Sequence, residues 1–494
     1  MYRSFLGGLC LLLTLLPVIY LDNLRFIYNE KRIIVSISLI ISGILVLFIS
    51  REKLKRIVSF LPDYFWWGAL LFLLISGISA FKSSLTFYSI VEISLFLLLV
   101  WTALITAYVT QNHNFGKYAV IVSACFVALF YTIKFGLGYT FYLMEFKDFP
   151  LWPASGLKTG TIGFANIRFF NQVQVFTLPL LLGGGLLAIK KGKNVGFFLI
   201  TLSAIWWMLL IQSAGRGIML SVLTAALVIL YLFKENTHRW MWYFLGTLLI
   251  GYVTKVLLFD IVPVDSGFSK SIVRGGSPRF TLYPRTFLAS LNHPIIGHGP
   301  MSFADMNVEF TPSHPHNSIL QLLYELGYPA TIMIIGVIFY GLKKWSKQTK
   351  EQFETVKEDL FEEGIIRISL TAALFGALLY SLLSGVIVMP LSQLWLALVF
   401  GTALGLYVKN DSTELSLESI KTYKVIGFKL LLLFASITLA SVLIKDIPHL
   451  RENEERFVEK TDSQTFRPRF WQQGKIGVDQ MSDIEEKLNA ESNL

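Results

Sequence analysis

The residues best suited to chemistry are two histidines, His314 and His316, in the run Ser313-His314-Pro315-His316-Asn317. This run leads directly into an apolar helix predicted over Ser318–Leu342. The loop before it contributes three arginines: Arg274, Arg279 and Arg285. An imidazole can accept a proton near neutral pH, and a guanidinium keeps its charge and binds phosphate oxygens in pairs. A base beside fixed cations, where a loop meets a membrane helix, therefore favours chemistry on an anionic, lipid-borne substrate.

Composition predicts an all-α, polytopic membrane protein. The chain has 494 residues, of which 54% are hydrophobic and only 15% charged, whereas soluble domains average about 25% charged residues. Apolar runs of roughly 17–25 residues, each long enough to cross a bilayer as a helix, recur along the chain. The first run has no small-residue cleavage site after it, so we expect a retained helix. About thirteen spans are predicted: Phe5–Leu21, Ile33–Ser50, Leu61–Ala80, Phe87–Val109, Tyr118–Leu137, Val173–Ile189, Val195–Gln212, Ile218–Phe233, Trp240–Phe259, Ser318–Leu342, Ile368–Met389, Leu391–Val408 and Val425–Ile444.

Lysine and arginine in the short loops orient these spans. The basic clusters all fall on one face if the N-terminus is cytoplasmic: Arg51–Arg56, Lys190–Lys193, Lys234 with Arg239, and Lys343–Lys350. The loop Asp260–Asn317, with four of the seven histidines, then lies on the opposite, exoplasmic face. We therefore divide the chain into a membrane region (1–259), an exoplasmic catalytic loop (260–317), a second membrane region (318–444) and an exoplasmic tail (445–494).

A further arginine, Arg216, stands in the short turn Gln212–Gly217 between two spans. An arginine at a helix end can simply extend its charge to the membrane interface. This one, however, lies on the face where cations are disfavoured, and a charge beside the membrane core is a functional candidate. Arg216 is therefore a candidate for contact with a phosphate.

Three motifs resemble those of the bacterial O-antigen ligase and polymerase superfamily. Ser213–Gly217 resembles its Ser-x-Ser-Arg-Gly turn. Arg279-x-x-x-Tyr283 followed by Pro294–Gly299 resembles its Arg-x-x-x-Trp segment that closes in Pro-x-x-Gly-x-Gly, with Tyr in place of Trp. His316-Asn317 followed after nine residues by Gly327 resembles the ligase hallmark, although Ala330 stands where Gly, Thr or Tyr is usual. The resemblance covers roughly residues 166–389.

The resemblance implies an integral-membrane C-type glycosyltransferase with a periplasmic helical cap, in the bacterial inner membrane. Such enzymes transfer a glycan from undecaprenyl diphosphate to an acceptor hydroxyl without a cofactor. Carried over to this chain, His316 is the general base, and Arg216 and Arg279 stabilise the diphosphate. Further substrate-binding candidates are Arg274, Tyr283, Arg285, His298, His314, Asn317 and Glu325. Asn317 is also a suitable N-cap for the helix that follows.

Four activities remain open. The acceptor is the lipid A–core, as for an O-antigen ligase, or a protein Ser/Thr, or a growing glycan, as for a polymerase. A transporter of lipid-linked glycans is the non-enzymatic alternative, but charge is then expected within the spans. His314, His316 and the upstream residues His298, Asp305 and Glu309 are of the types that bind metal ions. The chain has no Asp-x-Asp motif, so we expect arginines to take the place of a metal ion. We expect no nucleic acid partner.

Two segments give weaker signals. The tail has apolar residues at helical spacing (Val478, Met481, Ile484 and Leu488), so part of it is predicted to fold onto the exoplasmic face. A tail of this kind raises the prospect of a protein acceptor. The loop Met144–Gln172 contains Asn166, Arg168 and Asn171, and we interpret it as an ordinary interfacial loop.

Overall fold

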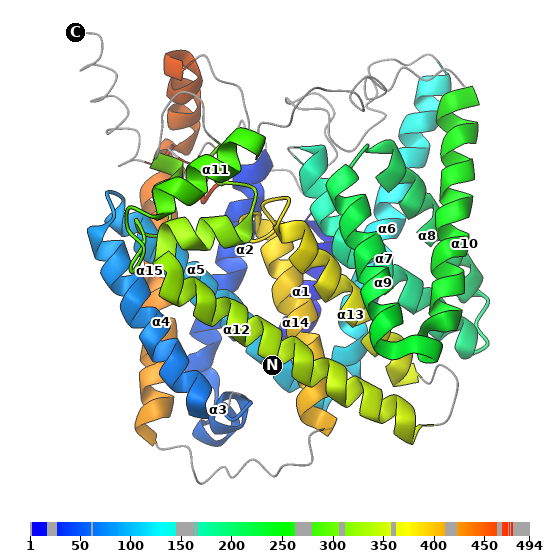
Figure 1. The fold of residues 1–494 in the computed structure, drawn as a ribbon, viewed down its shortest axis with the longest axis horizontal. Coiled ribbons are helices and arrows are strands. Elements are labelled where there is room, and N and C mark those ends of the chain that lie inside the picture. The colour runs from blue at the N-terminus through cyan, green and yellow to red at the C-terminus, as the bar shows by residue number, and fades with distance from the viewer. Residues whose placement is uncertain are drawn as a thin grey trace.

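The computed structural model describes residues 2–16, 27–60, 63–144, 164, 166–261, 279–305, 312–356, 362–410, 422–461, 467–472, 474 and 476–477. Every regular element in these ranges is a helix (Figure 1), which confirms the all-α class. The longer elements are α1 (Tyr2–Leu15), α2 (Ile27–Ile44), α3 (Arg51–Val58), α4 (Asp63–Lys82), α5 (Thr86–Asn112), α6 (Asn114–Leu143), α7 (Ile167–Lys190), α8 (Val195–Gln212), α9 (Arg216–Phe233), α10 (His238–Lys255), α11 (Arg279–Ser290), α12 (Ser318–Thr355), α13 (Glu362–Ser381), α14 (Pro390–Asn410) and α15 (Thr422–Thr461). Short 3-10 turns cover Leu45–Phe48, Lys234–Thr237 and Ser302–Asp305, and a π-helical turn covers Val256–Ile261.

The polytopic membrane character is confirmed, because 11 helical stretches among the described residues are long and apolar enough to cross a bilayer. The predicted number of spans differs at two places. The first helix, α1, has only 14 residues. The stretch Arg216–Ile261 is one continuous apolar region of 46 residues, within which α9 and α10 are separated by the turn Lys234–Thr237. The number thirteen thus stays a prediction.

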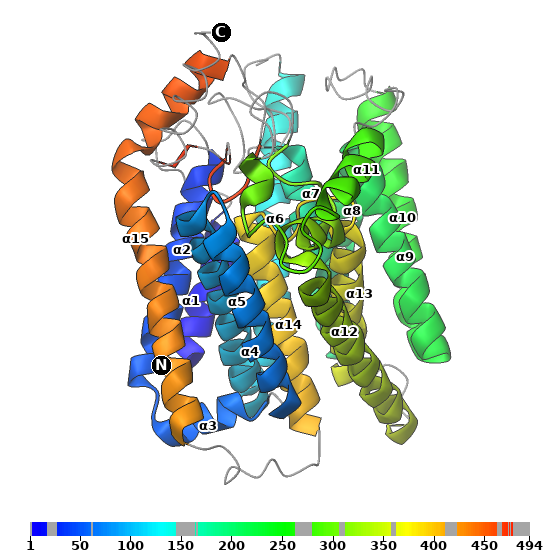
Figure 2. The same cartoon turned by 60° about the vertical axis from the view of Figure 1, so that its left-hand side comes forward.

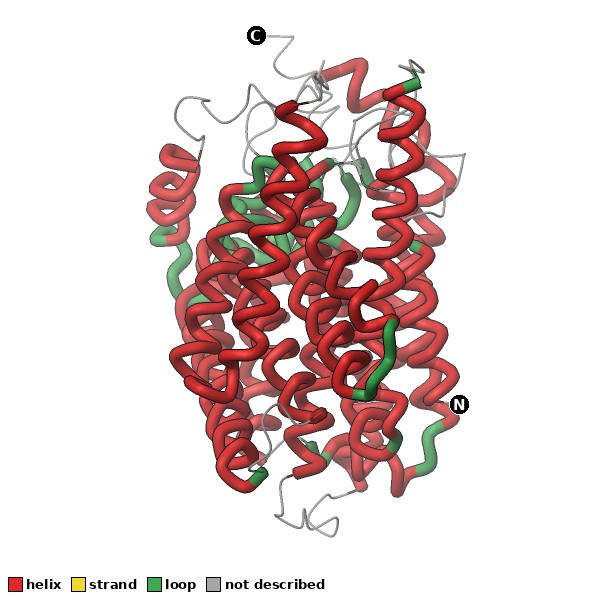
Figure 3. Tube along the Cα trace, turned by 90° about the vertical axis from the view of Figure 1, so that its right-hand side faces the viewer, coloured by secondary structure: helices red, strands yellow, loops and turns green. Residues whose placement is uncertain are grey.

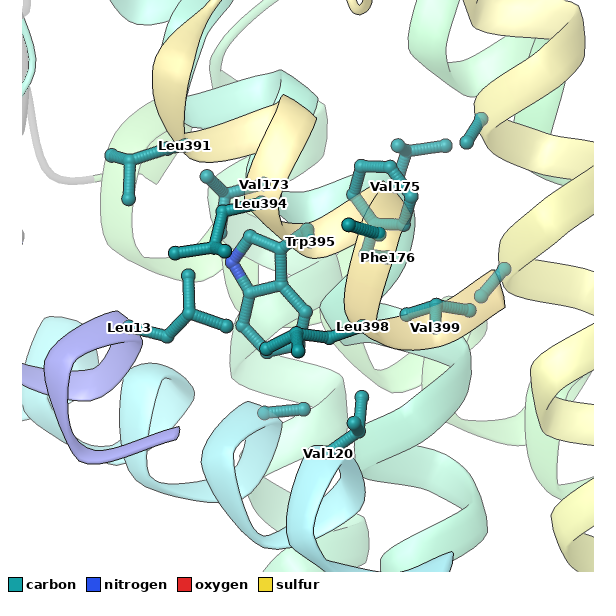
Figure 4. Packing of buried hydrophobic residues seen from close by; sticks show 14 of the residues in the cluster. Leu13, Val120, Val173, Val175, Phe176, Leu391, Leu394, Trp395, Leu398 and Val399 are labelled. Atoms are coloured by element: carbon teal, nitrogen blue, oxygen red, sulfur yellow. The ribbon is translucent and has the colours of Figure 1, made fainter. Parts of the chain in front are cut away.

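Four helices form the centre of the bundle. In the most apolar windows of α7 and α13, 89% and 83% of residues are buried, against 17% in α4 and 33% in α12. Figure 4 shows Trp395 of α14 among Leu13, Val120, Val173 and other apolar side chains. Polar side chains of the interior find partners there, as the Trp206 indole does when it donates to Thr177 Oγ1 at 3.0 Å. The central helices α5, α7, α13 and α14 thus supply a rigid frame.

The two ends of the bundle differ in charge and in structure. The helix α9 begins at Arg216 and ends beside Lys234, so these cations lie about 27 Å apart at opposite ends. The basic end includes α3, at the bottom of Figure 1, and the Glu362 carboxylate, which pairs with Lys117 at 3.1 Å and Lys191 at 3.2 Å. At the other end lies α11, and Figure 3 shows loops gathered in this upper part of the bundle.

Two departures from regular helix shape this upper end. The predicted span Ile368–Met389 ends earlier, because α13 stops at Ser381 and α14 starts at Pro390, where proline suits the first helical position. The intervening residues Leu382–Met389 form a connection that we call the α13–α14 junction. The second departure is a kink in α12 at Gly327, where φ is 78° and ψ is 176°. The helix runs obliquely across the bundle in Figure 1.

The last helix, α15, extends past the predicted boundary at residue 444 to Thr461 and forms one edge of the bundle in Figure 2. After it, residues 467–472 return to the bundle, and Arg469, Phe470, Trp471 and Gln472 are each at most 2% exposed. The predicted amphipathic residues Val478, Met481, Ile484 and Leu488 lie outside the described residues.

Candidate active site

The motifs singled out from the sequence meet at the α13–α14 junction. Tyr283 of α11 donates its hydroxyl to two carbonyl oxygens, those of His316 and Leu382, at 3.2 Å each. Ser318, the first residue of α12, donates to the Ser381 carbonyl at 3.0 Å. Burial, opposed by Arg279, raises the pKa of Tyr283, so the phenol keeps the proton that it donates. The junction therefore fixes the start of α12 and the His316 backbone relative to α11.

The Arg216 turn reaches the end of α13 and the same junction. A β-carbon added at Gly217 would lie 3.4 Å from Tyr380 and 3.5 Å from Leu383, so the turn packs directly on this segment. Ala214, in the same turn, has a left-handed φ of 49°. The tight turn starts α9 at Arg216, and the Arg216 side chain is exposed. Within the described parts of the chain, the Arg216 side chain makes no ion pair.

His316 itself lies between the junction and the second histidine. Its φ of 57° is left-handed, a conformation in which His is several-fold enriched over most residues. The His314 and His316 rings meet edge to face, with centroids 4.2 Å apart. Burial, followed by the cations Arg279 and Arg168, lowers the pKa of His316 to about 4. The imidazole is therefore neutral at pH 7 and holds a free lone pair, as a proton acceptor requires.

Two arginines act electrostatically on His316. Arg279 is the first residue of α11 and is partly buried, and Arg168 lies exposed in the first turn of α7. The Asn166 side chain caps that turn by accepting from the Arg168 backbone N–H at 2.9 Å. Arg168 was predicted from the sequence to lie in an ordinary interfacial loop, and the structure places it in the first turn of α7 instead. Asn166 two residues before a cation at the start of a span is the signal that could have identified it.

Asn317 caps α12, as predicted, because its side-chain oxygen accepts from the Leu320 N–H at 3.0 Å. Its side chain thus satisfies one of the free amide groups at the helix N-terminus. The remaining arginines of the predicted cluster are less constrained. Arg285 is exposed on α11, and Arg274 lies outside the described residues.

The motif residues Pro294–Gly299 and Gly327 lie at the α12 kink rather than at His316. His298 and Gly299 donate their backbone N–H groups to the carbonyls of Tyr324 and Glu325, both at 2.9 Å. The His298 ring stacks on Tyr324 with centroids 4.1 Å apart, and burial lowers its pKa. A β-carbon at Gly327 would lie 2.5 Å from the Ile295 carbonyl oxygen, which explains why glycine is needed here. The segment Pro294–Gly299 therefore holds the kink in place.

Glu325 is directed into the protein interior. Its carboxylate accepts from Arg469 at 2.6 Å and from the Phe303 N–H at 3.4 Å, and the residue is 3% exposed. No cluster of three or more His, Cys, Asp or Glu that could hold a metal ion occurs among the described residues. The side chains of Asp305 and Glu309, which the sequence analysis considered as ligands, lie outside that part of the structure.

The family comparison covers this site. Residues 198–335 match the O-antigen ligase family, Wzy_C. The resemblance inferred from the motifs is confirmed. No curated protein matches the chain. The O-antigen ligase family match indicates glycosyltransferase activity of the ligase or polymerase type in an integral membrane protein. The matched region contains Arg216, Arg279, His314, His316 and Gly327.

Three structural parts of the site lie outside the matched region. They are Arg168, the α13–α14 junction and the C-terminal residues 467–472, 474 and 476–477. The C-terminal residues reach the histidine loop, where the Pro468 carbonyl contacts His314 Nδ1 at 3.2 Å. This segment was not among the residues predicted from the sequence, because the tail was expected only to fold onto the exoplasmic face.

Proposed function

We propose that this protein transfers a glycan from undecaprenyl diphosphate to an acceptor hydroxyl on the periplasmic face of the inner membrane. The preferred acceptor is the lipid A–core, which makes the protein an O-antigen ligase. His316 is the general base, and Arg216 and Arg279 stabilise the departing diphosphate. Arg168 joins them as a third cation. No cofactor is required in this scheme.

One observation carries the proposal: three motifs far apart in the sequence contact the same short segment. Gly217, Tyr283 and Ser318 pack on or bond to Tyr380–Leu383. The turn with Arg216, the helix that starts at Arg279 and the loop with His316 therefore surround one junction. A neutral base and several cations at one end of a membrane bundle suit a substrate with a lipid tail and a charged headgroup.

In the proposed reaction the acceptor oxygen attacks the anomeric carbon of the glycan. The new carbon–oxygen bond forms as the bond from that carbon to the diphosphate oxygen breaks, and the electron pair leaves with undecaprenyl diphosphate. His316 takes the proton of the acceptor hydroxyl. The guanidinium groups face the negative charge that grows on the leaving group, and such fixed charges stabilise a transition state without rearrangement.

The electrostatics couple donor binding to the strength of the base. In the absence of an anion, Arg279 and Arg168 help to depress the pKa of His316 to about 4. Burial is the largest cause of the depression and stays in place, but a bound diphosphate offsets the two cations and raises the pKa of His316 part of the way toward its ordinary value of about 6.5. A stronger base is thus available only when the donor is in place, which favours transfer over unproductive proton uptake.

The test is a deletion strain in which three products are examined together. An O-antigen ligase predicts loss of the lipopolysaccharide ladder with long carrier-linked glycans intact. Loss of a glycoprotein would instead assign a protein acceptor, and carrier-linked glycans of a single repeat would assign a polymerase. An unchanged set of all three products contradicts the proposal. Restoration of the ladder by the wild-type gene but not by His316→Ala links the product to the site.

A further inference from the structure

The C-terminal residues 467–472, 474 and 476–477 form a strap across the upper end of the bundle, which we call the C-terminal strap. Arg469 is its main anchor. The Arg469 guanidinium donates to Glu92 of α5 at 2.7 and 3.2 Å and to Glu325 of α12 at 2.6 Å. The Arg469 and Glu325 residues are 1% and 3% exposed. A buried cation between two carboxylates is a demanding arrangement, since loss of one partner leaves buried charge unpaired.

Further bonds attach the strap to α2 and α15. Arg32 of α2 is 1% exposed and donates to the Phe470 carbonyl at 3.0 Å and to Gln393 at 2.7 Å. The Trp471 indole donates to Asp446 of α15 at 2.6 Å. Asn29 accepts from the Gln472 N–H at 2.7 Å. The strap thus binds four helices through polar groups buried inside the protein. The side-chain amide of Gln472 is also buried but has no hydrogen-bond partner among the described residues.

The strap also contacts the histidine loop at two points. The Pro468 carbonyl lies 3.2 Å from His314 Nδ1, and a carbonyl oxygen only accepts, so Nδ1 carries the proton. A β-carbon at Gly474 would lie 2.3 Å from the Ser313 hydroxyl oxygen, so the backbones approach closely there. The strap therefore selects the His314 tautomer and limits where the loop can lie.

In this tautomer the other ring nitrogen, Nε2, is unprotonated, and its lone pair faces the protein interior. His314 is 1% exposed, and Nε2 has no hydrogen-bond partner among the described residues. On one side, a β-carbon at Gly385 of the junction would lie 2.5 Å from Nε2. The His314 ring also packs edge to face on His316. An anchored ring in this place restricts the orientation of the His316 imidazole.

We infer that the C-terminal strap is a positioning element of the active site, which holds His316 for catalysis through the contact from Pro468 to His314. The inference rests on the proposed function, and it assigns to Arg469 and His314 a role in rate rather than in donor binding. The strap lies outside the region that matches the ligase family.

The first test is a double-mutant cycle on initial rates of glycan transfer in proteoliposomes that contain the full-length protein. Arg469→Gln releases the anchor, and His314→Phe keeps a ring but removes the Nδ1 donor. We expect each change to lower kcat at least about tenfold with the donor KM within about twofold, since misorientation of a catalytic group acts on the rate. The double variant is no slower than the worse single one, because both changes break the same path.

The matched control is Arg451→Gln, which removes an exposed arginine that pairs with Glu455 at 3.4 Å on α15. It is expected to keep the wild-type rate. Rate losses that multiply in the double variant, or losses confined to the donor KM, overturn the inference. A wild-type protein that transfers no glycan contradicts the proposed function instead, so the two failures are distinct.

A second test leaves Arg469 and His314 unchanged and crosslinks the strap to the histidine loop. Ser313→Cys and Gly474→Cys, in a background with Cys10→Ala and Cys125→Ala, place two thiols at the close contact. The β-carbon position at Gly474 lies 2.8 Å from the Ser313 β-carbon, so the two must separate by about 1 Å to reach the usual β-carbon spacing of a disulfide. We expect the oxidised protein to form this bond and to keep a transfer rate within about twofold of the reduced protein. Failure to form the crosslink overturns the inference. Activity only after reduction also overturns it, because the strap would then have to move away from the histidine loop during transfer.

Discussion

Two regions of the upper end both contain residues of the family motifs, but they differ in whether the polar groups of those residues are already bonded within the protein. The first is the His316 cluster, in which Tyr283, His316 and the exposed Arg216 surround the α13–α14 junction. The second is the kink cluster, in which Pro294–Gly299 pairs with Tyr324–Gly327 of α12. The first cluster keeps cations at the surface, whereas the polar groups of the second bond to each other.

This difference separates residues that can meet a substrate from residues that hold the frame. Glu325 shows the contrast, because its carboxylate already accepts from Arg469 and from Phe303. Arg216 makes no such ion pair with any described residue and stays exposed. We therefore expect substitutions in the His316 cluster to slow transfer without unfolding, and substitutions in the kink cluster to unfold the protein. The predictions below test that separation.

The largest effect is expected from His316→Ala. Loss of a general base typically costs about 10²–10⁴ in rate, and we expect kcat for glycan transfer to fall within that range. The fold should survive, since Asn317 and Ser318 still fix the start of α12. Initial rates in proteoliposomes and the melting temperature in detergent measure the two quantities.

His293→Ala is the matched control for that experiment. His293 is exposed and lies just before the kink cluster, with its ring centroid 4.5 Å from that of His298. We expect near wild-type transfer. An equal loss in both variants would show that histidine removal acts generally on this end of the protein, and would break the distinction between the clusters.

The next effect concerns the geometry of phosphate contact. Arg279→Lys keeps the charge at the start of α11 but loses the planar, two-pronged donor. We expect a fall in kcat of roughly 10–100-fold, nearly as large as for Arg279→Ala, because stabilisation of a diphosphate depends on paired hydrogen bonds. Arg451→Lys, on the exposed face of α15, is the control. Full activity of Arg279→Lys would mean that charge alone suffices.

The kink cluster is tested by glycine replacement within a single helix. Gly327→Ala places a β-carbon 2.5 Å from the Ile295 carbonyl oxygen at a φ of 78°. We expect a loss of stability of about 2 kcal/mol or more, because strain at a left-handed residue and a backbone clash add. Gly336→Ala, on the same helix, has no atom within 4 Å and should be neutral or stabilising. Melting temperatures that change equally would contradict the assigned role of Gly327.

The sequence predicted the fold class, and its family motifs named most residues of the His316 cluster, but not their meeting at the α13–α14 junction. Apolar runs of membrane length define helices, and Asn317 before an apolar run defines a cap that the structure contains. Arg216 and Arg279 were noticeable as cations on the face where topology disfavours them. Arg168 was missed because Asn166 and Arg168 were interpreted as part of a longer polar loop rather than as the capped start of α7.

The C-terminal strap could not be predicted by the same reasoning. Arg469 is separated by 377 residues from Glu92 and by 144 from Glu325, and a single sequence gives no signal for pairing over such distances. Glu92 and Glu325 stand inside apolar helices, where an acid indicates a partner without naming it. Only the packing of α5, α12 and the strap identifies Arg469 as that partner.

The smallest expected effect is a shift in the pH dependence of kcat/KM. Its size in variants of Arg168 and Arg279 compares the two cations that act on His316. The base must be unprotonated, so kcat/KM, which reports the free enzyme, should fall as the pH drops through the His316 pKa of about 4. Both Arg279 and Arg168 lower this pKa, and Arg279 contributes more. Arg168→Gln should therefore move the acid limb of the profile to higher pH, and Arg279→Gln should move it further.

The profile of kcat, which reports the donor complex, should already lie at higher pH in the wild type, because the bound diphosphate offsets the same charges. Acid limbs that coincide in all three proteins would remove His316 as the titrating group and would place the base elsewhere at the junction.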